Sequence, residues 1–306
     1  MAVFGTGDAQ VLMPRNIADG MVKASRTLST VAQLSGREPQ RFGNVDYITF
    51  NNFPKAEFVE EGAQKASTTG AFDSVRSKPH KAQVTMRFNE EVQWLDEDYQ
   101  LGVMRELGDA GQVALSRALD LGLYHRINPL SGTAITGWDN YITSTTKRTE
   151  LGTADADATF KAAVGLLVTA SPSWPVNGAA FDPKFSWALS QLMERDGSGE
   201  TSRQRYPSLG FGTNVTDFMG INVAQGDTVS GTPEATDTKV RAIVGDFTNG
   251  IRWGVQRDIP VELIRFGDPD GQGDLKRNNQ IAMRLEIVYG WYVFADRFAV
   301  VEDAAA

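Results

Sequence analysis

The sequence lacks cysteine entirely and contains only two histidines, His80 and His125. Disulfide bonds and thiolate chemistry are therefore excluded, and a zinc site would have to depend on carboxylates without paired histidines. His80 is predicted to lie at a strand edge. His125 is predicted near the end of a long helix, where a positive charge suits the helix dipole. Neither histidine stands in a pattern typical of catalysis.

Long apolar runs are missing as well. No segment reaches the roughly 18 consecutive apolar residues of a membrane span, and the N-terminus lacks the basic start and apolar core of a secretory signal. Basic residues are in deficit, because 30 Lys and Arg face 38 Asp and Glu and give a formal net charge of −8. Tight, sequence-independent binding of nucleic acid needs clustered Lys and Arg. The balance therefore argues against such binding, but it is compatible with a position beside packaged nucleic acid.

What is present is typical of a folded protein. The chain has 306 residues, of which 41% are hydrophobic and 22% charged, enough for one large domain or two smaller ones. Motifs for catalysis or ion binding are weak. Gly197-Ser198-Gly199 lacks the nucleophile-elbow pattern, and residues 268–274 resemble a calcium loop without its final Glu. We predict no enzyme, no cofactor and no metal site, and we interpret 268–274 as a solvated turn.

Two extended runs around a polar segment indicate a long β-hairpin. Aromatic and β-branched residues recur over 46–58 and again over 72–88, with the Gly-punctuated stretch 60–70 between them. The apolar residues are too few for a two-stranded ribbon to be stable alone, so we expect the hairpin to lie on a neighbouring molecule. Residues 1–40 also lack a self-contained core and are predicted to form an arm, with a helix within 16–34.

The clearest helix opens at Asp96-Glu97-Asp98, whose acidic side chains suit a first turn. Apolar or small residues then recur at spacings of three and four, and the helix should stop before Asn128-Pro129. Further helices are predicted over 155–169 and from Asp182-Pro183 through Leu192, ending before Asp196-Gly197. Strand-like segments lie at 221–224, 240–247, 251–255, 261–266 and 281–301, and the last of these fits a buried strand pair. Helices and strands without regular βα alternation predict an α+β fold.

This order of elements resembles the Hong Kong 97-type major capsid proteins of tailed bacteriophages. Residues 54–65 are similar to the family's extended-loop tip, because Phe58-Val59-Glu60-Glu61-Gly62-Ala63-Gln64-Lys65 follows its aromatic-x-x-Glu-Gly-Ala-x-Lys pattern. Further matching segments, in the family's order, are Lys78-Pro79-His80-Lys81-Ala82, Asn89-Glu90-Glu91, Ala118-Leu119-Asp120, 244–250 and 279–286. Together they cover nearly the whole chain.

The resemblance implies a division into four parts and a structural role. The parts are an N-arm (1–40), an extended loop (41–84), a peripheral domain with the spine helix (85–135 and 245–288) and an axial domain (136–244 and 289–306). The implied role is a subunit that assembles into pentamers and hexamers, forming an icosahedral shell around double-stranded DNA in the virion. We expect assembly in the bacterial host cytoplasm, with a separate scaffolding protein, a portal and a maturation protease as partners. Contacts between subunits are expected at Phe58, Glu61, Lys65, Lys78 and Lys81.

Some members of this family join subunits by an isopeptide bond between a loop-tip lysine and an asparagine, assisted by a glutamate. Lys65, Asn279 and Glu286 match those positions. A neutral lysine amine would attack the side-chain amide while a buried carboxylate takes the proton. The alternative is that Lys65 is a solvated tip residue, Asn279 caps a turn and Glu286 pairs with an arginine.

Two other functions stay open at the level of sequence. An encapsulin, a nanocompartment shell that encloses a cargo enzyme, would share the fold but should begin with an amphipathic cargo-binding helix. A soluble α+β hydrolase would use acid pairs such as Glu90-Glu91 and Asp96-Glu97-Asp98, which charged helix starts explain more simply. The arm-like N-terminus and the long hairpin favour the phage shell.

Overall fold

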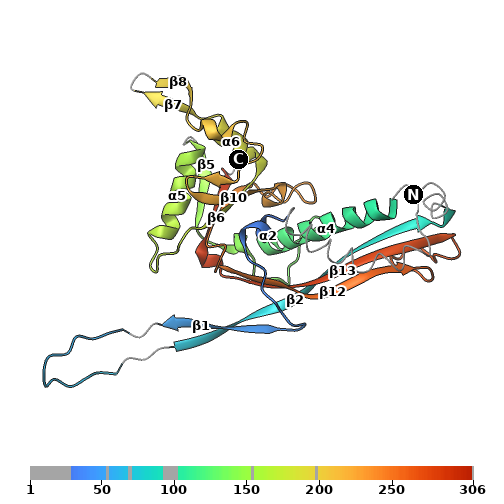
Figure 1. Ribbon diagram of the computed structural model, residues 1–306, viewed down its shortest axis with the longest axis horizontal. Coiled ribbons are helices and arrows are strands. Elements are labelled where there is room, and N and C mark those ends of the chain that lie inside the picture. Colours follow the sequence, from blue (N-terminus) through green and yellow to red (C-terminus); the bar gives the residue numbers. More distant parts are fainter. Residues whose placement is uncertain are drawn as a thin grey trace.

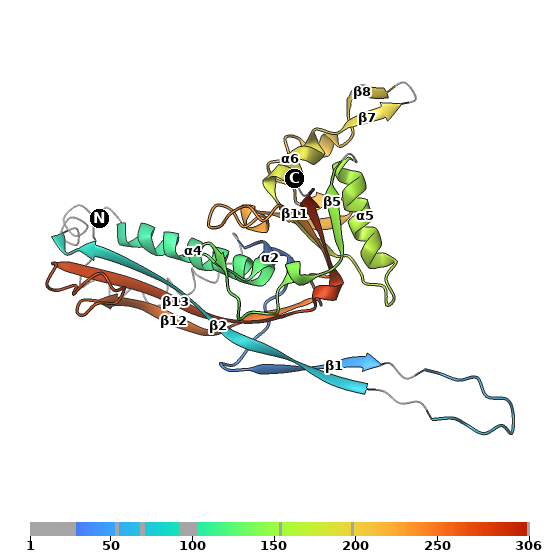
Figure 2. The same ribbon diagram turned by 180° about the vertical axis from the view of Figure 1, so that it is seen from behind.

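The computed structural model describes residues 29–52, 55–67, 71–91, 103–152, 155–196 and 199–304. Two bodies make up this part of the chain (Figure 1). In the first, a long helix lies along a four-stranded sheet, and the second is built around a six-stranded sheet that stands over one end of the first. A two-stranded ribbon projects away from both (Figure 2). The mixture of helices and sheets confirms the predicted α+β class.

The four-stranded sheet carries the first body. Its order is β1-β2-β13-β12, and every neighbouring pair is antiparallel. The strands are β1 Val45–Asn52, β2 Ala71–Asn89, β12 Ile251–Ile264 and β13 Gln280–Val293. Strand β2 is shared, because it pairs with β1 as far as Ser77 and with β13 from Lys78 to Asn89. One continuous strand therefore joins the ribbon to the sheet.

Helix α4 (Val103–His125) packs on one face of this sheet. Successive residues of a strand alternate between the two faces. The odd-numbered residues of β13 from Ile281 to Val293 are buried and form one apolar cluster with Leu115 and Leu119 of the helix. The approach is close near the end of the helix. A Cβ added to Gly122 would lie 3.0 Å from the Trp291 side chain.

The six-stranded sheet has the order β5-β14-β11-β6-β10-β9. Its strands are β5 Arg148–Leu151, β6 Gly178–Phe181, β9 Asp217–Phe218, β10 Ile221–Gln225, β11 Val240–Gly245 and β14 Phe298–Asp303. Helices α5 (Ala156–Val168) and α6 (Pro183–Ser190) belong to the same body. Their apolar sides meet the sheet in a second core, in which the rings of Phe160 and Phe181 lie 5.4 Å apart.

Shorter elements complete the chain. They are α2 Thr30–Leu34, β3 Ile127–Asn128, β4 Thr133–Ala134, β7 Met193–Asp196, β8 Gly199–Gln204, and the 3₁₀ turns η1 Ile142–Ser144, η2 Pro207–Leu209, η3 Asp227–Val229 and η4 Ala295–Arg297. Within the described ranges, no helix has the length and apolar character needed to cross a membrane.

Several predicted boundaries are confirmed. Helix α4 ends at His125, before Asn128-Pro129, and α5 is flanked by Asp155 and Thr169. Helix α6 begins as predicted, with the Asp182 carboxylate accepting a hydrogen bond of 2.8 Å from the Lys184 amide. The acidic helix start at 96–98 and most of the helix predicted within 16–34 lie outside the described residues.

Other predicted boundaries are wrong. Helix α6 stops at Ser190, because the chain turns into the β7–β8 hairpin before Asp196. The two strands predicted at 251–255 and 261–266 form the single strand β12, whose interruption in the sequence corresponds to two irregularities in its pairing with β13. The stretch 281–301, predicted to be a buried strand pair, does form two strands, β13 and β14, separated by η4, but these belong to different sheets and do not pair with each other.

Candidate assembly interface

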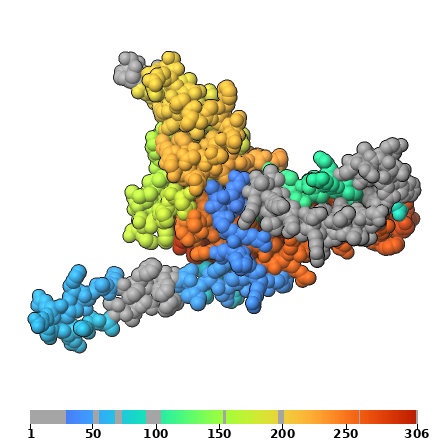
Figure 3. Space-filling model, viewed as in Figure 1, coloured from blue at the N-terminus to red at the C-terminus, as the bar shows by residue number. Residues whose placement is uncertain are grey.

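The tip of the hairpin, defined here as residues 55–67, stands clear of the rest of the molecule (Figure 3). Every residue in it is exposed, and it contains three of the predicted contact residues, Phe58, Glu61 and Lys65. The Phe58 side chain has no cover at all, with a relative exposure of 107%. Few internal contacts hold the tip, for example a bond of 3.1 Å from the Ala63 amide to the Glu60 carbonyl. A large apolar side chain is thus presented on a thin support.

The two strands behind the tip are also exposed. Arg76 and Asp46 form an ion pair of 2.6 Å across them, and more than half of the Ile48 side chain faces solvent. At its base the hairpin is tied to the body. There the Tyr47 hydroxyl accepts a hydrogen bond from Gln40 and donates one to Glu38. Burial, followed by the Glu38 charge, raises the pKa of Tyr47 to about 12.

The predicted contact lysines of β2 lie where the hairpin enters the sheet. Lys78 and Lys81 are three residues apart and so face opposite sides of the sheet. Lys81 Nζ lies 2.7 Å from a carboxylate oxygen of Glu286. Lys78 is exposed and forms no ion pair within the described part of the chain. The two lysines therefore do not form one patch, and Lys78 is the one left available.

A pocket of about 280 Å³ opens beside Lys78, at the base of the hairpin. It is lined by Arg76, Lys78, His80, Gly137, Trp138, Asp139, Asn140, Trp291 and Tyr292. The His80 ring stacks on Trp291 at 3.9 Å and lies 4.2 Å from Trp138. Burial, followed by the nearby Lys78 charge, lowers the pKa of His80 to about 4. The pocket thus joins a neutral aromatic wall to a cationic rim.

The predicted position of His80 is confirmed, because β2 pairs there with Tyr289 of β13 while β1 has already ended opposite Ser77. The interpretation of His125 as a favourable positive charge is wrong. Its ring is buried at the end of α4, which lowers its pKa to about 4, so the ring is neutral near pH 7. A ring nitrogen, Nε2, lies 2.9 Å from the Val229 carbonyl oxygen, and this contact fixes the helix end to a loop instead.

The structure does not bring the three crosslink residues together in one subunit. Lys65 is at the tip, whereas Asn279 directly precedes β13 and Glu286 lies seven residues further along the chain, roughly 23 Å away at the usual strand rise. Asn279 lies in a turn with φ 53°, and its side-chain amide donates to Glu91. Glu286 pairs with Lys81 rather than with an arginine. The crosslink itself stays a prediction.

The acidic turn 268–274 has a cation of its own. The Arg87 guanidinium donates to both Asp268 and Asp270 and to the carbonyl oxygens of Gln272 and Gly273. Its side chain is only 9% exposed. An arginine from β2 therefore neutralises the carboxylates that resembled calcium ligands. Among the described residues, no group of three or more potential metal ligands occurs.

A buried anchor that the sequence interpretation missed is Asp120 on α4. Its carboxylate accepts hydrogen bonds from the Thr30 amide at 2.9 Å, the Thr30 hydroxyl at 2.8 Å and the Thr228 hydroxyl at 2.7 Å. Ser29 and Val31 also donate to it. Burial raises the pKa of this carboxyl, and the hydrogen bonds oppose the rise. The signal was available in the sequence, because a charged residue between Leu119 and Leu121 interrupts an apolar stripe.

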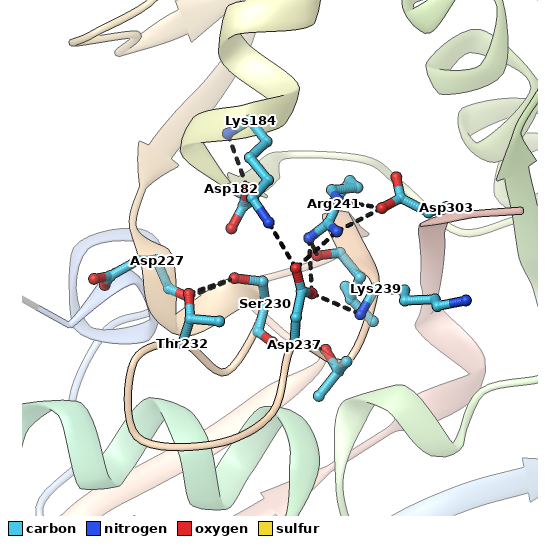
Figure 4. A network of polar contacts seen from close by, with 11 residues as sticks. Asp182, Lys184, Asp227, Ser230, Thr232, Asp237, Lys239, Arg241 and Asp303 are labelled. Atoms are coloured by element: carbon cyan, nitrogen blue, oxygen red, sulfur yellow. Dashed lines mark hydrogen bonds and ion pairs between the residues drawn. The ribbon is translucent and has the colours of Figure 1, made fainter. Parts of the chain in front are cut away.

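The loop that receives Asp120 and His125, residues 226–239, is called the junction loop here. It lies between the two bodies and is held from both sides. From α4, the Arg117 guanidinium pairs with Glu234 and, at 2.6 Å, with Asp227. From β11, Arg241 makes two hydrogen bonds of 2.9 Å to Asp237 (Figure 4).

Arg241 also donates to Asp303 at 2.8 Å, and Lys184 pairs with Asp237 at 2.7 Å (Figure 4). These cations hold the pKa of Asp237 well below its ordinary value, the hydrogen bonds from Arg241 being the largest cause. The junction loop is thereby the polar link between the helix of the first body and the sheet of the second.

Comparison with known proteins places the chain among phage proteins. A solved structure from Mycobacterium phage Ogopogo is 44% identical, with a TM-score of 0.80, and the match covers 90% of this chain and 92% of that one. One from Gordonia phage Cozz is 28% identical, also with a TM-score of 0.80, over 91% of this chain and 87% of that one. The capsid of an empty GTA particle, computed with C5 symmetry, shares the fold at 15% identity and a TM-score of 0.60, over 90% of each chain. No protein-family model and no curated protein matches the sequence.

Proposed function

Because the chain belongs to the major capsid proteins of tailed bacteriophages, we propose that it assembles into pentamers and hexamers that tile an icosahedral shell. The shell encloses double-stranded DNA without sequence-specific binding, in keeping with a net charge of −8. Assembly takes place in the bacterial host cytoplasm. A separate scaffolding protein, a portal and a maturation protease are its partners.

One observation carries this proposal. The hairpin ends in a tip whose residues are all exposed, including a bare Phe58. An exposed two-stranded ribbon gains little stability from itself, and large apolar side chains on thin supports mark interaction sites. A second copy of the chain lying under the ribbon supplies the missing cover. Many modest contacts of this kind add up around a closed shell.

We keep the division into N-arm (1–40), extended loop (41–84), peripheral domain (85–135 and 245–288) and axial domain (136–244 and 289–306) as part of the proposal. The two bodies support it in outline. Strands β2 and β13 run without a break through the positions 84/85 and 288/289. These parts are therefore mechanically joined rather than linked by flexible segments.

An encapsulin shell is the second candidate that the fold allows. The 44% identical relative comes from a phage, which favours the phage shell. The two differ in what co-purifies with the particle: a DNA-filled shell supports the first, and a protein cargo without DNA supports the second.

The test is negative-stain electron microscopy of the purified chain, alone and together with a scaffolding protein encoded beside it. Closed shells, or discrete pentamers and hexamers, are expected. A chain that stays monomeric under every condition contradicts the proposal. Denaturing gels of the same particles test the Lys65–Asn279 crosslink, which predicts a ladder of covalent multimers, whereas a single monomer band rules it out.

A further inference from the structure

We propose that the pocket at the base of the hairpin, lined by Arg76, Lys78, His80, Trp138 and Trp291, receives the hairpin tip of a second copy of this chain, with Phe58 as the inserted side chain. The proposal rests on the proposed function, because it names the partner surface of the exposed tip. The tip is fully exposed, and the pocket is an opening lined by exposed, half-buried and buried side chains.

The pocket offers two kinds of contact. Its wall is aromatic, because it is lined by the half-buried rings of His80 and Trp138, and His80 stacks on Trp291, which is itself buried. Its rim is cationic. The Arg76 guanidinium is already paired with Asp46, which lies on β1. The lining also contains one acidic residue, Asp139. Lys78 is thus the cation of the rim that can bind an incoming carboxylate, and it forms no ion pair among the residues the structure describes.

The tip offers the complement. Phe58 is flanked by Glu57, Glu60 and Glu61, and all four side chains are exposed. Aromatic rings pair favourably edge to face, beyond what the area they bury contributes. A carboxylate next to the inserted ring is placed to meet Lys78. Opposite charges at the rim of an interface favour one partner and one register.

A chain cannot fill its own pocket. From Lys78 the hairpin runs outward through Ala71 to Glu61, a length of up to roughly 56 Å at an extended rise. Figures 1 and 2 place the tip at the far end of the ribbon from the sheet. The occupant is therefore a second copy, and repeating the same step passes the contact from each copy to the next. Such head-to-tail contacts close into rings.

The absence of cysteine makes a clean test possible. Each of Glu57→Cys, Glu60→Cys and Glu61→Cys is combined with Lys78→Cys, which leaves Phe58 in place. A disulfide requires Cα atoms within about 7 Å. After mild oxidation of assembled particles, at least one pair should give a ladder of covalent multimers on a non-reducing gel, and dithiothreitol should collapse it to monomers. The single-cysteine variants, and the tip variants combined with Val168→Cys on α5, should stay monomeric.

The outcomes separate this proposal from the proposed function. If the cysteine pairs assemble like wild type but give only monomer bands, the docking proposal is overturned while the capsid function stands. If wild type itself never assembles, the proposed function fails and this proposal fails with it. Should the pairs themselves disturb assembly, Lys78→Glu decides. It should raise the concentration needed for assembly roughly tenfold, the control charge reversal Arg105→Glu on the exposed side of α4 should not, and equal behaviour of the two overturns the docking.

Discussion

The hairpin tip (55–67) and the junction loop (226–239) are two irregular segments of similar length with opposite surroundings. The tip is exposed throughout, and few internal contacts hold it. The junction loop is gripped by Arg117, Asp120 and His125 from α4 and by Arg241 from β11. Both segments look alike in sequence, as polar stretches with Gly.

The difference teaches where order in an irregular segment comes from. Backbone groups without a regular ladder must find other partners, and in the junction loop buried charged side chains provide them. In the tip no such anchors exist among the described residues, so its order has to be supplied by another molecule. Substitutions in the junction loop should therefore change the stability of the chain, and substitutions in the tip should change only its assembly.

The largest effect on stability is expected at Asp120. Asp120→Ala leaves buried donors of Thr30 and Thr228 without an acceptor, and it should lower the free energy of unfolding by roughly 3 kcal/mol. Urea denaturation followed by tryptophan fluorescence measures this. Asp120→Asn keeps a carbonyl acceptor and should lose clearly less. Equal losses in the two variants would mean that the hydrogen bonds do not carry the effect.

Arg241→Met should come next, at roughly 2 kcal/mol near pH 7, because Asp237 and Asp303 lose their shared cation. The pKa of Asp237 is lowered in the folded chain, so its contribution is complete above its ordinary value of 3.8 and is lost as the pH falls further. The difference between wild type and the variant should therefore shrink between pH 7 and pH 3. Unfolding free energies at both values check this, and a constant difference contradicts it.

His125 predicts a smaller, pH-dependent effect. Its pKa is lowered from 6.5 to about 4 by burial, so the unfolded chain binds the proton first as the pH falls. The contribution of neutral His125 to the free energy of unfolding is fully present above pH 6.5, and it should drop by roughly 1–2 kcal/mol between pH 7 and pH 5. His125→Gln should remove this part of the drop. His80, whose pKa is also lowered to about 4, should contribute a second part of the drop that His125→Gln leaves in place. A His125→Gln variant with an unchanged pH profile would refute the assignment to His125.

The smallest effect on stability is expected at the tip. Phe58→Ser should leave the free energy of unfolding within about 0.5 kcal/mol of wild type, because the Phe58 side chain is fully exposed in the subunit. Assembly, measured by sedimentation, should nevertheless weaken roughly tenfold. Phe266→Ser changes another exposed phenylalanine and should affect neither quantity. A destabilised Phe58→Ser monomer would remove the contrast between the two segments.

The sequence predicted those elements whose signals are local. The end of α4 before Asn128-Pro129 and the Asp182-Pro183 start of α6 follow from backbone chemistry alone. The hairpin followed from alternating residues around a polar tip. Likewise, the exposure of Phe58 and Lys65 could be predicted from the resemblance of residues 54–65 to an extended-loop tip.

What was missed depends on distant parts of the chain. Strand β6 consists of Gly178-Ala179-Ala180-Phe181, which carries no β-branched signal and is a strand only because it lies between β10 and β11. The β7–β8 hairpin reads as a polar loop. The junction loop has no periodicity at all, and only the fold shows that Arg117 and Arg241 reach it from opposite sides. The pocket at the hairpin base joins residues 76–80, 137–140 and 291–292, which no local pattern brings together.

Strand β2 has a mechanical consequence. It runs unbroken from Ala71 to Asn89, with β1 along its outer part and β13 along its inner part. Because the hydrogen bonds between antiparallel strands lie across the strand direction, a pull on the tip along β2 loads the bonds to β13 together, in shear, rather than opening them one by one. A pulling force from a neighbouring molecule is thereby transmitted through β2 to its pairing with β13, inside the four-stranded sheet of the subunit.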